Sequence, residues 1–201
     1  MIKITAILLA AGLSSRMKGE NKMLLPYKGT TILQSTYDQL KASNVDRVII
    51  VGGSFYEQIV KQIKIDSSDK IIQNNNPAAG MTSSIQTGVK TDKENAFMIC
   101  LGDMPLISSK QYKVLIDCYL AAVQKDQKTI VVPKVNDQQG NPVIFSQHYR
   151  EDILMNLEPN GCKSVIELNK SHLVHLNTND SHYLSDIDTP EDYDQIINDP
   201  Q

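Results

Sequence analysis

The sequence predicts an α/β domain built around a mainly parallel sheet. Short, continuously apolar runs alternate along the chain with amphipathic stretches whose apolar residues recur at helical spacing. Continuous apolar runs are typical of strands buried on both faces, and strands separated by helices imply crossover connections. The chain has 201 residues, of which 41% are hydrophobic, so it is long enough to bury one substantial core.

Four strands are expected from strong apolar runs and a fifth from a weaker one. The strong runs cover residues 4–9, 47–51, 96–101 and 129–132, and the shorter run at 70–73 is a candidate edge strand. Glycine follows the second and third runs, and Pro133 follows the fourth. These residues favour turns, so each run is expected to end there.

Helices are expected between the strands, over residues 32–40, 56–65 and 108–123. Ser108 or Ser109 is a suitable N-cap for the third of them. A last helix begins near Thr189, which would cap it, with Pro190 in the first turn. We expect one domain over residues 1–197, followed by a loose tail at 198–201.

Composition excludes several classes of function. A formal net charge of −3 and a pI near 5.8 do not favour nucleic-acid binding. No apolar run approaches the roughly 20 residues that cross a bilayer, and the start shows no signal-peptide cleavage pattern. Three widely spaced cysteines without a CxxC pair favour a reducing cytoplasm. We therefore expect a cytoplasmic protein without nucleic-acid or membrane partners.

A turn rich in small residues follows the first strand. Residues 8–17 read LLAAGLSSRM, and Lys22 lies a few residues further on. Small residues let a ligand approach the backbone closely, and turn amides can hold phosphate oxygens. Arg16 and Lys22 supply the positive charge that a triphosphate requires. The segment is neither a Walker A loop nor a dinucleotide fingerprint, and an ordinary strand-to-helix turn with surface cations is an equal alternative.

Acidic residues follow the third strand and precede the last helix. Asp103, in LGDMP, comes just after a buried strand, where open α/β sheets bind ligands. Such a carboxylate suits Mg²⁺, although Gly-Asp-x-Pro is also common turn chemistry. Asp186 and Asp188, in DIDTPED, could complete a metal site with Asp103. The acids at 191 and 192 simply complement the helix dipole.

A third segment, GMTSSI at residues 80–85, places a glycine and hydroxyl groups at the start of a helix. Free amides there can hydrogen-bond a base or a sugar. Plain N-capping is the commoner use of serine and threonine at such a position.

Taken together, these segments resemble the MobA-like nucleotidyltransferase family, and within it the molybdenum cofactor cytidylyltransferase branch. The shared motifs are LAAGLSSRM with Lys22, GMTSSI, GDMP, GNPVIF at 140–145 and DIDTPED, in the expected order. The resemblance implies a Rossmann-like three-layer αβα fold of the nucleotide-diphospho-sugar transferase type. It also implies a reaction in which an acceptor phosphate attacks the α-phosphorus of a nucleoside triphosphate and pyrophosphate leaves.

The resemblance implies roles position by position. Arg16 and Lys22 would hold the triphosphate, and Asp103 would bind Mg²⁺ with Asp186 or Asp188 as the second acidic ligand. Residues expected to bind the nucleotide are Leu8, Ala10, Ala11, Gly12, Leu13, Gly80, Ser83 and Ser84. Residues expected to contact the acceptor are Asn141, Pro142 and Lys163. Phosphoryl-type transfer depends on positioning and charge stabilisation, which suits such a set.

Ala11 favours CTP as the substrate. GTP-using members of the family usually have a second glycine where Ala11 stands, and the extra methyl raises the floor of the pocket. A methyl group changes binding by only about 1–3 kcal/mol, so GTP stays an alternative.

Two departures from the family pattern concern the loop and the acceptor. Lys18 stands where the family usually has glycine, so it either adds a phosphate contact or the loop shifts by one residue. Residues 161–164 read GCKS, where molybdopterin-using members usually read closer to GDxGAR. Lys163 therefore either meets an acceptor phosphate or is a solvated helix-start lysine, the commoner situation.

Three functions are compatible with these residues. The first is a Mg²⁺-dependent cytidylyltransferase acting on molybdopterin, with a molybdoenzyme or a chaperone client as a conceivable protein partner. The second keeps the chemistry but uses another small phosphorylated acceptor, such as a sugar or alcohol phosphate. The third is a nucleotide-binding accessory protein without turnover, which the presence of Arg16, Lys22 and Asp103 disfavours.

Overall fold

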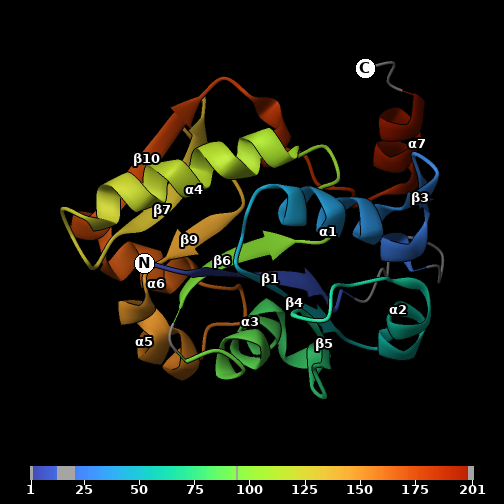
Figure 1. Ribbon diagram of the computed structural model, residues 1–201, viewed down its shortest axis with the longest axis horizontal. Coiled ribbons are helices and arrows are strands. Elements are labelled where there is room, and N and C mark those ends of the chain that lie inside the picture. The colour runs from blue at the N-terminus through green and yellow to red at the C-terminus, as the bar shows by residue number, and fades with distance from the viewer. Residues whose placement is uncertain (1, 13–20, 94, 199–201) are drawn as a thin grey trace.

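The computed structural model describes residues 2–12, 21–93 and 95–198 and shows a twisted central sheet between two layers of helices (Figure 1). The eight-stranded sheet has the order β10-β7-β9-β6-β1-β4-β5, and β8 pairs with β7 outside this path. The strands are β1 (Ile4–Ala10), β4 (Arg47–Gly52), β5 (Lys70–Gln73), β6 (Ala96–Leu101), β7 (Ile130–Val135), β8 (Gln138–Gln139), β9 (Val143–Phe145) and β10 (Leu173–Thr178). A separate ribbon pairs β2 (Pro26–Tyr27) with β3 (Thr30–Thr31).

Helices cover both faces of this sheet. The helices are α1 (Ile32–Ala42), α2 (Tyr56–Gln62), α3 (Met81–Lys90), α4 (Ser109–Val123), α5 (Arg150–Met155), α6 (Lys163–Leu168) and α7 (Pro190–Asn198). In Figure 1, α1 and α4 lie on one side of the sheet, and α3 and α5 lie on the other. The expected three-layer αβα arrangement is therefore confirmed.

Strand β1 shows why an apolar run without alternation belongs at the centre of this fold. Its even-numbered residues, from Ile4 to Ala10, pack in the core beneath α1 and α4. Ile7 and Leu9 point to the opposite face, where they pack in the core that includes α3. Because successive side chains of a strand point to opposite faces, both sets must be apolar when helices cover both faces.

The strand ladder is parallel except at β9 and β8. β1 pairs in parallel with β4 and β6, and β5 lies at the edge beyond β4, as its short run predicts. β9 runs antiparallel to both β6 and β7 and was not expected from the sequence. Its three residues are too few to show a period that separates a strand from other buried structure.

Two element ends lie three residues away from the expected position. β7 continues through Pro133 to Val135, because Pro133 falls between the residues that pair with β9 and those that pair with β8. A proline is tolerated where the ladder has no hydrogen bond to lose. The helix expected to reach residue 65 ends at Gln62, and the next residue is already extended.

The helix caps follow the sequence closely. Ser108 caps α4, and its side chain and that of Gln111 form a reciprocal capping box. At the start of α7, Asp192 accepts hydrogen bonds from the backbone of Asp188 and Thr189, and Thr189 accepts one in return. α7 includes Asn198, and residues 199–201 lie outside the described part of the chain. Among the described helices, none combines the length and the apolar character needed to span a bilayer.

Candidate active site

The candidate site lies at the topological switch point of the sheet, where successive strands change from one side of β1 to the other. From β1 the chain adds β4 and β5 on one side, and β6 then pairs on the other side of β1. A crevice forms outside the carboxyl ends of strands at such a point and is the usual ligand site of open α/β sheets. Here Ala11 and Gly12 follow β1, and Gly102 and Asp103 follow β6.

A cavity of about 350 Å³ opens at this crevice. Its walls come from the first turn, from the segment before α3 and from the end of β6. The lining residues are Leu9, Ala11, Gly12, Lys22, Met23, Pro77, Ala78, Gly80, Met81, Ser84, Leu101 and Asp103. The structure thus brings the expected first turn, the GMTSSI segment and the GDMP segment to one cavity.

Lys22 and Asp103 form a buried ion pair at the cavity wall. The Lys22 Nζ lies 2.5 Å from Asp103 Oδ2, and each residue is only 8% exposed. Lys22 belongs to a single turn of 3₁₀ helix that Asn21 caps by accepting a hydrogen bond from the backbone of Met23. Because the Met23 side chain packs in the core, this turn fixes the backbone position of Lys22.

The last acidic segment completes the environment of Lys22. Its Nζ donates to the carbonyl of Ile187 at 2.7 Å and to Asp188 Oδ1 at 3.1 Å. Burial alone would lower the pKa of Lys22, but the charge of Asp103 and the hydrogen bonds to Asp103 and Asp188 raise it above its ordinary value. Lys22 is therefore a firmly charged ammonium group.

Three carboxylates gather around this point. One oxygen from each of Asp103, Asp186 and Asp188 can lie within 4.8 Å of the others. Between the last two, Ile187 is fully buried and donates its backbone N–H to the carbonyl of Asp103 at 3.0 Å. The alternation of acid, isoleucine and acid therefore buries the isoleucine and leaves both carboxylates exposed beside Asp103.

The electrostatics of the three acids favour a cation. Although Asp186 is an exposed residue, partial desolvation of its carboxylate raises its pKa, and the negative charges of Asp103 and Asp188 raise that pKa further. Asp103 Oδ1 is buried and has no hydrogen-bond partner among the described residues. Buried polar atoms normally have partners, so an open carboxylate oxygen in an acidic cluster fits a metal ligand position.

The Ser83–Ser84 pair is held by a residue that the sequence did not single out. Asn74, at the end of β5, donates from Nδ2 to Ser83 Oγ at 2.8 Å and to Ser84 Oγ at 3.0 Å. Ser83 Oγ also donates to the carbonyl of Gly80. Ser84 lines the cavity. Asn74 is buried. In the sequence it is the first of three asparagines before a proline, a pattern that is equally typical of a turn.

Gly80 stands at the start of α3 with a φ of +88°, which disfavours any residue with a side chain. A Cβ there would lie 2.7 Å from the carbonyl oxygen of Pro159. The neighbouring Thr82 hydroxyl contacts the carbonyl of Glu158 and accepts a hydrogen bond from the backbone of Gly161. The start of α3 is therefore fixed against the 158–161 loop.

The residues expected to contact the acceptor are divided between two places. Asn141 and Pro142, joined by a cis peptide bond, immediately precede β9. Because β9 runs antiparallel to β6 and pairs Val143 with Ile99, its start lies at the edge of the sheet that holds Asp103. Lys163 is exposed and lines a different hollow.

The remaining predicted residues divide by their position in the chain. The side chains of Leu8 and Ala10 are buried within β1, so these residues can contact a ligand only through backbone atoms. Leu13, Arg16 and Lys18 lie outside the described residues.

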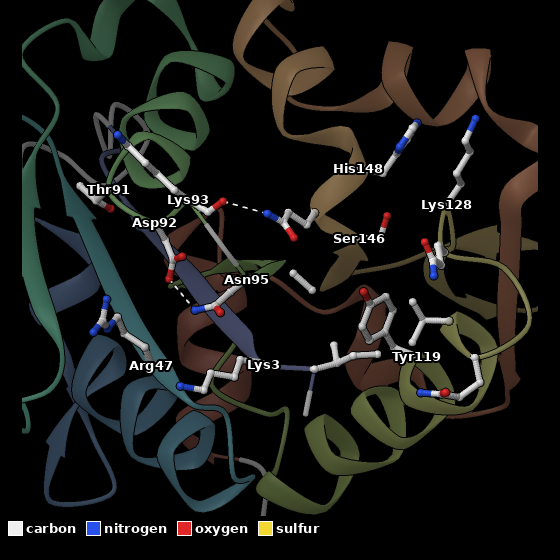
Figure 2. Close-up of a pocket in the computed structure, with 16 residues that line it drawn as sticks. Lys3, Arg47, Thr91, Asp92, Lys93, Asn95, Tyr119, Lys128, Ser146 and His148 are labelled. Atoms are coloured by element: carbon white, nitrogen blue, oxygen red, sulfur yellow. Dashed lines mark hydrogen bonds between the residues drawn. The ribbon is translucent and has the colours of Figure 1, made fainter.

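A larger hollow of about 1080 Å³ lies at the opposite edge of the sheet, at the start of β1, β4 and β6 (Figure 2). Asp92, the one acid among the described residues that line this hollow, has a structural role. It accepts hydrogen bonds from Thr5 Oγ1 at 2.5 Å and from Asn95 Nδ2 at 2.8 Å. In the described part of the chain, the single grouping of three potential metal ligands is the one at Asp103. Size alone therefore does not mark the site.

Comparison with known families agrees with this geometry. A family model described as the MobA-like NTP transferase domain matches residues 6–176. The chain belongs to the MobA-like NTP transferase family. The match includes Lys22 and Asp103 and ends before the last acidic segment. Family membership makes this chain a nucleotidyltransferase.

Individual relatives match over nearly the whole chain. The molybdenum cofactor cytidylyltransferase of Escherichia coli (strain K12) is 25% identical over 193 residues, which cover 96% of this chain and 95% of the relative. The crystal structure of Rv0371c from Mycobacterium tuberculosis H37Rv superposes with a TM-score of 0.83 at 24% identity, covering 98% of this chain and 99% of that one. A complex of Rv0371c with manganese gives 0.76 at 24% identity, covering 98% and 100%. These structures show that the MobA-like transferase shares their fold.

Proposed function

We propose that this MobA-like transferase moves a CMP group from CTP to the phosphate of molybdopterin, as molybdenum cofactor, and uses Mg²⁺. An acceptor phosphate oxygen would form a bond to the α-phosphorus of CTP. The bond from that phosphorus to the bridging oxygen of the pyrophosphate would break, and pyrophosphate would leave with the electron pair. The nucleophile is already an anion, so no serine, cysteine or histidine nucleophile is required.

One observation carries the proposal. Lys22 and Asp103 line the switch-point cavity, and Asp186 and Asp188 join Asp103 in one carboxylate cluster, although these residues lie as much as 166 positions apart in the sequence. A lysine beside a carboxylate cluster supplies both kinds of charge that a triphosphate and a divalent cation need.

The residues of the cavity support distinct roles. The backbone of Ala10, Ala11 and Gly12 would approach the nucleotide, because the first turn presents little side chain to the cavity. Ser84, fixed by Asn74, would lie beside the base or the ribose. Lys22 would bind the triphosphate and stabilise the charge on the departing pyrophosphate, a role that Arg16 would share.

The carboxylate cluster fits a divalent cation. Its donors are oxygen atoms, which Mg²⁺ prefers, and Asp103 Oδ1 is buried without a partner among the described residues. Asp103, with Asp186 or Asp188, would hold the ion, which when bound would neutralise phosphate charge and polarise the α-phosphoryl group. The manganese complex of Rv0371c supports the use of a divalent metal.

The choice of CTP is supported by Ala11 and by the E. coli relative, which is named a molybdenum cofactor cytidylyltransferase. Ala11 lines the cavity and packs against Gly53, where an added Cβ would lie 2.7 Å from the Ala11 carbonyl oxygen. This close packing would limit how far the first turn can move away from the cavity to accept a larger base. The acceptor is supported by that same relative, and the start of β9 offers Asn141 and Pro142 at the correct edge.

Pyrophosphate release tests this proposal. Purified protein would be supplied with CTP, GTP, ATP or UTP and Mg²⁺, each with and without molybdenum cofactor. We expect release with CTP that depends on the cofactor. Cofactor-dependent release with GTP alone would transfer the proposal to a guanylyltransferase. Release that requires a sugar or alcohol phosphate instead would retain the chemistry and reject molybdopterin.

A further inference from the structure

The surroundings of the Lys22 ammonium group are those of a bound cation. Nζ lies 2.5 Å from Asp103 Oδ2, 2.7 Å from the Ile187 carbonyl oxygen and 3.1 Å from Asp188 Oδ1. Two carboxylates and a backbone carbonyl are also the donors that divalent cations select in proteins. The lysine therefore occupies the same cluster of oxygen atoms that would hold a metal ion, and it leaves Asp103 Oδ1 without a hydrogen-bond partner among the described residues.

An ammonium group and a divalent cation cannot occupy this cluster together without strong repulsion. Two cations a few ångströms apart in a partly buried site repel each other much more strongly than in water. Lys22 is 8% exposed, and its contacts come from segments on both sides of it, so its head group has little room beside a metal ion. Binding of a metal to Asp103 thus requires Lys22 to find another anion.

A bound triphosphate would supply that anion. Lys22 and Asp103 both line the 350 Å³ cavity, so phosphate oxygens entering it can reach the ammonium group. A lysine has a flexible four-carbon stem, which allows its head group to exchange partners without moving the turn that holds it.

We propose that Lys22 is an internal cation that occupies the carboxylate cluster of the nucleotide-free enzyme and is drawn onto the triphosphate when the metal binds. This inference rests on the proposed function, because it assigns the cavity to a nucleotide. Metal and nucleotide then bind cooperatively. By linkage, each increases the affinity for the other by the same factor.

Manganese binding without nucleotide tests the proposal independently of turnover. Mn²⁺ would be titrated into wild-type protein and into Lys22→Met, with free Mn²⁺ measured by electron paramagnetic resonance. We expect the Mn²⁺ affinity of the variant to exceed that of the wild type by about tenfold or more, because a competing charge has been removed. Equal affinity, or weaker binding by the variant, would overturn the proposal.

Two control variants identify the site of the gain. Lys41→Met removes another lysine that pairs with a buried aspartate, Asp69 at 2.9 Å, away from the cavity. Its Mn²⁺ affinity should equal that of the wild type. In Lys22→Met combined with Asp103→Asn the gain should disappear. A gain that persists there would place the metal elsewhere and reject the proposal.

A second pair of measurements serves if Lys22→Met does not fold. Lys22→Gln retains a hydrogen-bonding side chain and should show the same gain in Mn²⁺ affinity. In the wild type, water-proton relaxation reports Mn²⁺ bound to protein with and without a non-hydrolysable CTP analogue. We expect binding to the protein to strengthen about tenfold or more with the analogue, and unchanged binding would contradict the proposal.

These results separate the inference from the function beneath it. An enzyme that releases pyrophosphate but shows no gain in Mn²⁺ affinity leaves the proposed function standing and rejects the internal cation. A protein that gains Mn²⁺ affinity in Lys22→Met but uses no nucleoside triphosphate retains the lysine–metal competition and rejects the proposed reaction.

Discussion

Asp103 is buried, and its Oδ1 atom has no hydrogen-bond partner among the described residues. A substitution that removes its charge therefore tests the candidate site directly. Asp103→Asn preserves the size of the side chain and removes the charge. We expect turnover to fall by about 10²- to 10³-fold, the scale found when one pre-organised electrostatic group is lost. The measurement is the initial rate of pyrophosphate release, with thermal unfolding to show that the variant is folded.

The matched control is Asp117→Asn, which removes an exposed aspartate paired with Lys113 on α4. Its rate should equal that of the wild type. A near-normal rate for Asp103→Asn would remove Asp103 from the catalytic set.

Ala11 provides a test of base selection. Ala11→Gly removes the methyl group from the cavity wall, so the ratio of kcat/KM for CTP to that for GTP should fall by about tenfold. Ala78→Gly is the control, since Ala78 also lines the cavity but belongs to another segment. An unchanged ratio in Ala11→Gly, or an equal fall in both variants, would remove Ala11 from base selection.

The charged residues of the candidate site were the ones that the sequence predicted best. Lys22, Asp103, Asp186 and Asp188 follow or precede recognisable elements, and the structure brings them together. Asn74 was not predicted, because its importance comes from hydrogen bonds to Ser83 and Ser84 across a change of chain direction. Such contacts depend on tertiary structure and leave no local pattern.

At the scale of elements, the junction of β6 with the turn before Asp103 requires glycine. A Cβ on Gly102 would lie 2.8 Å from the Leu9 carbonyl oxygen and 3.0 Å from Leu33 Cδ1. Gly102→Ala should therefore lower the free energy of unfolding by about 1–3 kcal/mol, the usual cost of overpacking. Urea unfolding at neutral pH measures the loss.

Gly12→Ala is the matched comparison, because nothing lies within 4 Å of a Cβ at that position. Its free energy of unfolding should stay close to that of the wild type, while its affinity for nucleotide falls. If Gly102→Ala is as stable as Gly12→Ala, the close approach of β1 and the GDMP turn is not required by the fold.

The stability of the fold should decrease in acid partly through His175, which lies in the edge strand β10. Burial lowers the pKa of His175 below its ordinary value of 6.5, and the charge of Lys134 lowers it further. The folded protein therefore binds this proton less readily than the unfolded chain. The contribution of His175 to the stability of the fold is therefore complete above pH 6.5 and is lost as pH decreases through the window between 6.5 and the lowered pKa.

The test compares urea midpoints at pH 7.5 and pH 5.5 for the wild type and His175→Gln. The wild type should lose more stability on acidification than the variant, because the variant lacks the titrating group. Equal losses would show that His175 does not contribute to the acid sensitivity of the strand.

Strongly patterned elements were predictable, as was the four-residue β5, and some other short elements were not. Residues 4–9, 47–51 and 96–101 became β1, β4 and β6 with at most one residue added at an end. β9 and α5 have three and six residues, too few for a period to emerge. The N-cap of α4 was predictable to within one residue, Ser108 or Ser109, because a capping serine acts locally.

For the molecule as a whole, the parallel sheet is what makes the site. The turns after β1 and β6 and the start of α3 lie far apart in the sequence, yet parallel strands place all their carboxyl ends at one edge. The fold and the edge that holds the candidate site could therefore be inferred from element order. The acceptor could not, because the residues expected to contact it lie in the region after β7, where the elements are short and the family pattern changes.

The fate of the α-phosphate of CTP tests the central claim most directly. The enzyme would be incubated with Mg²⁺, molybdenum cofactor and CTP labelled with ³²P at either the α- or the γ-phosphate. Nucleotidyl transfer predicts that the α-label enters a new cofactor–nucleotide product and that the γ-label leaves in pyrophosphate. Transfer of the γ-label to the acceptor, or α-label recovered solely as free nucleotide, would contradict the account.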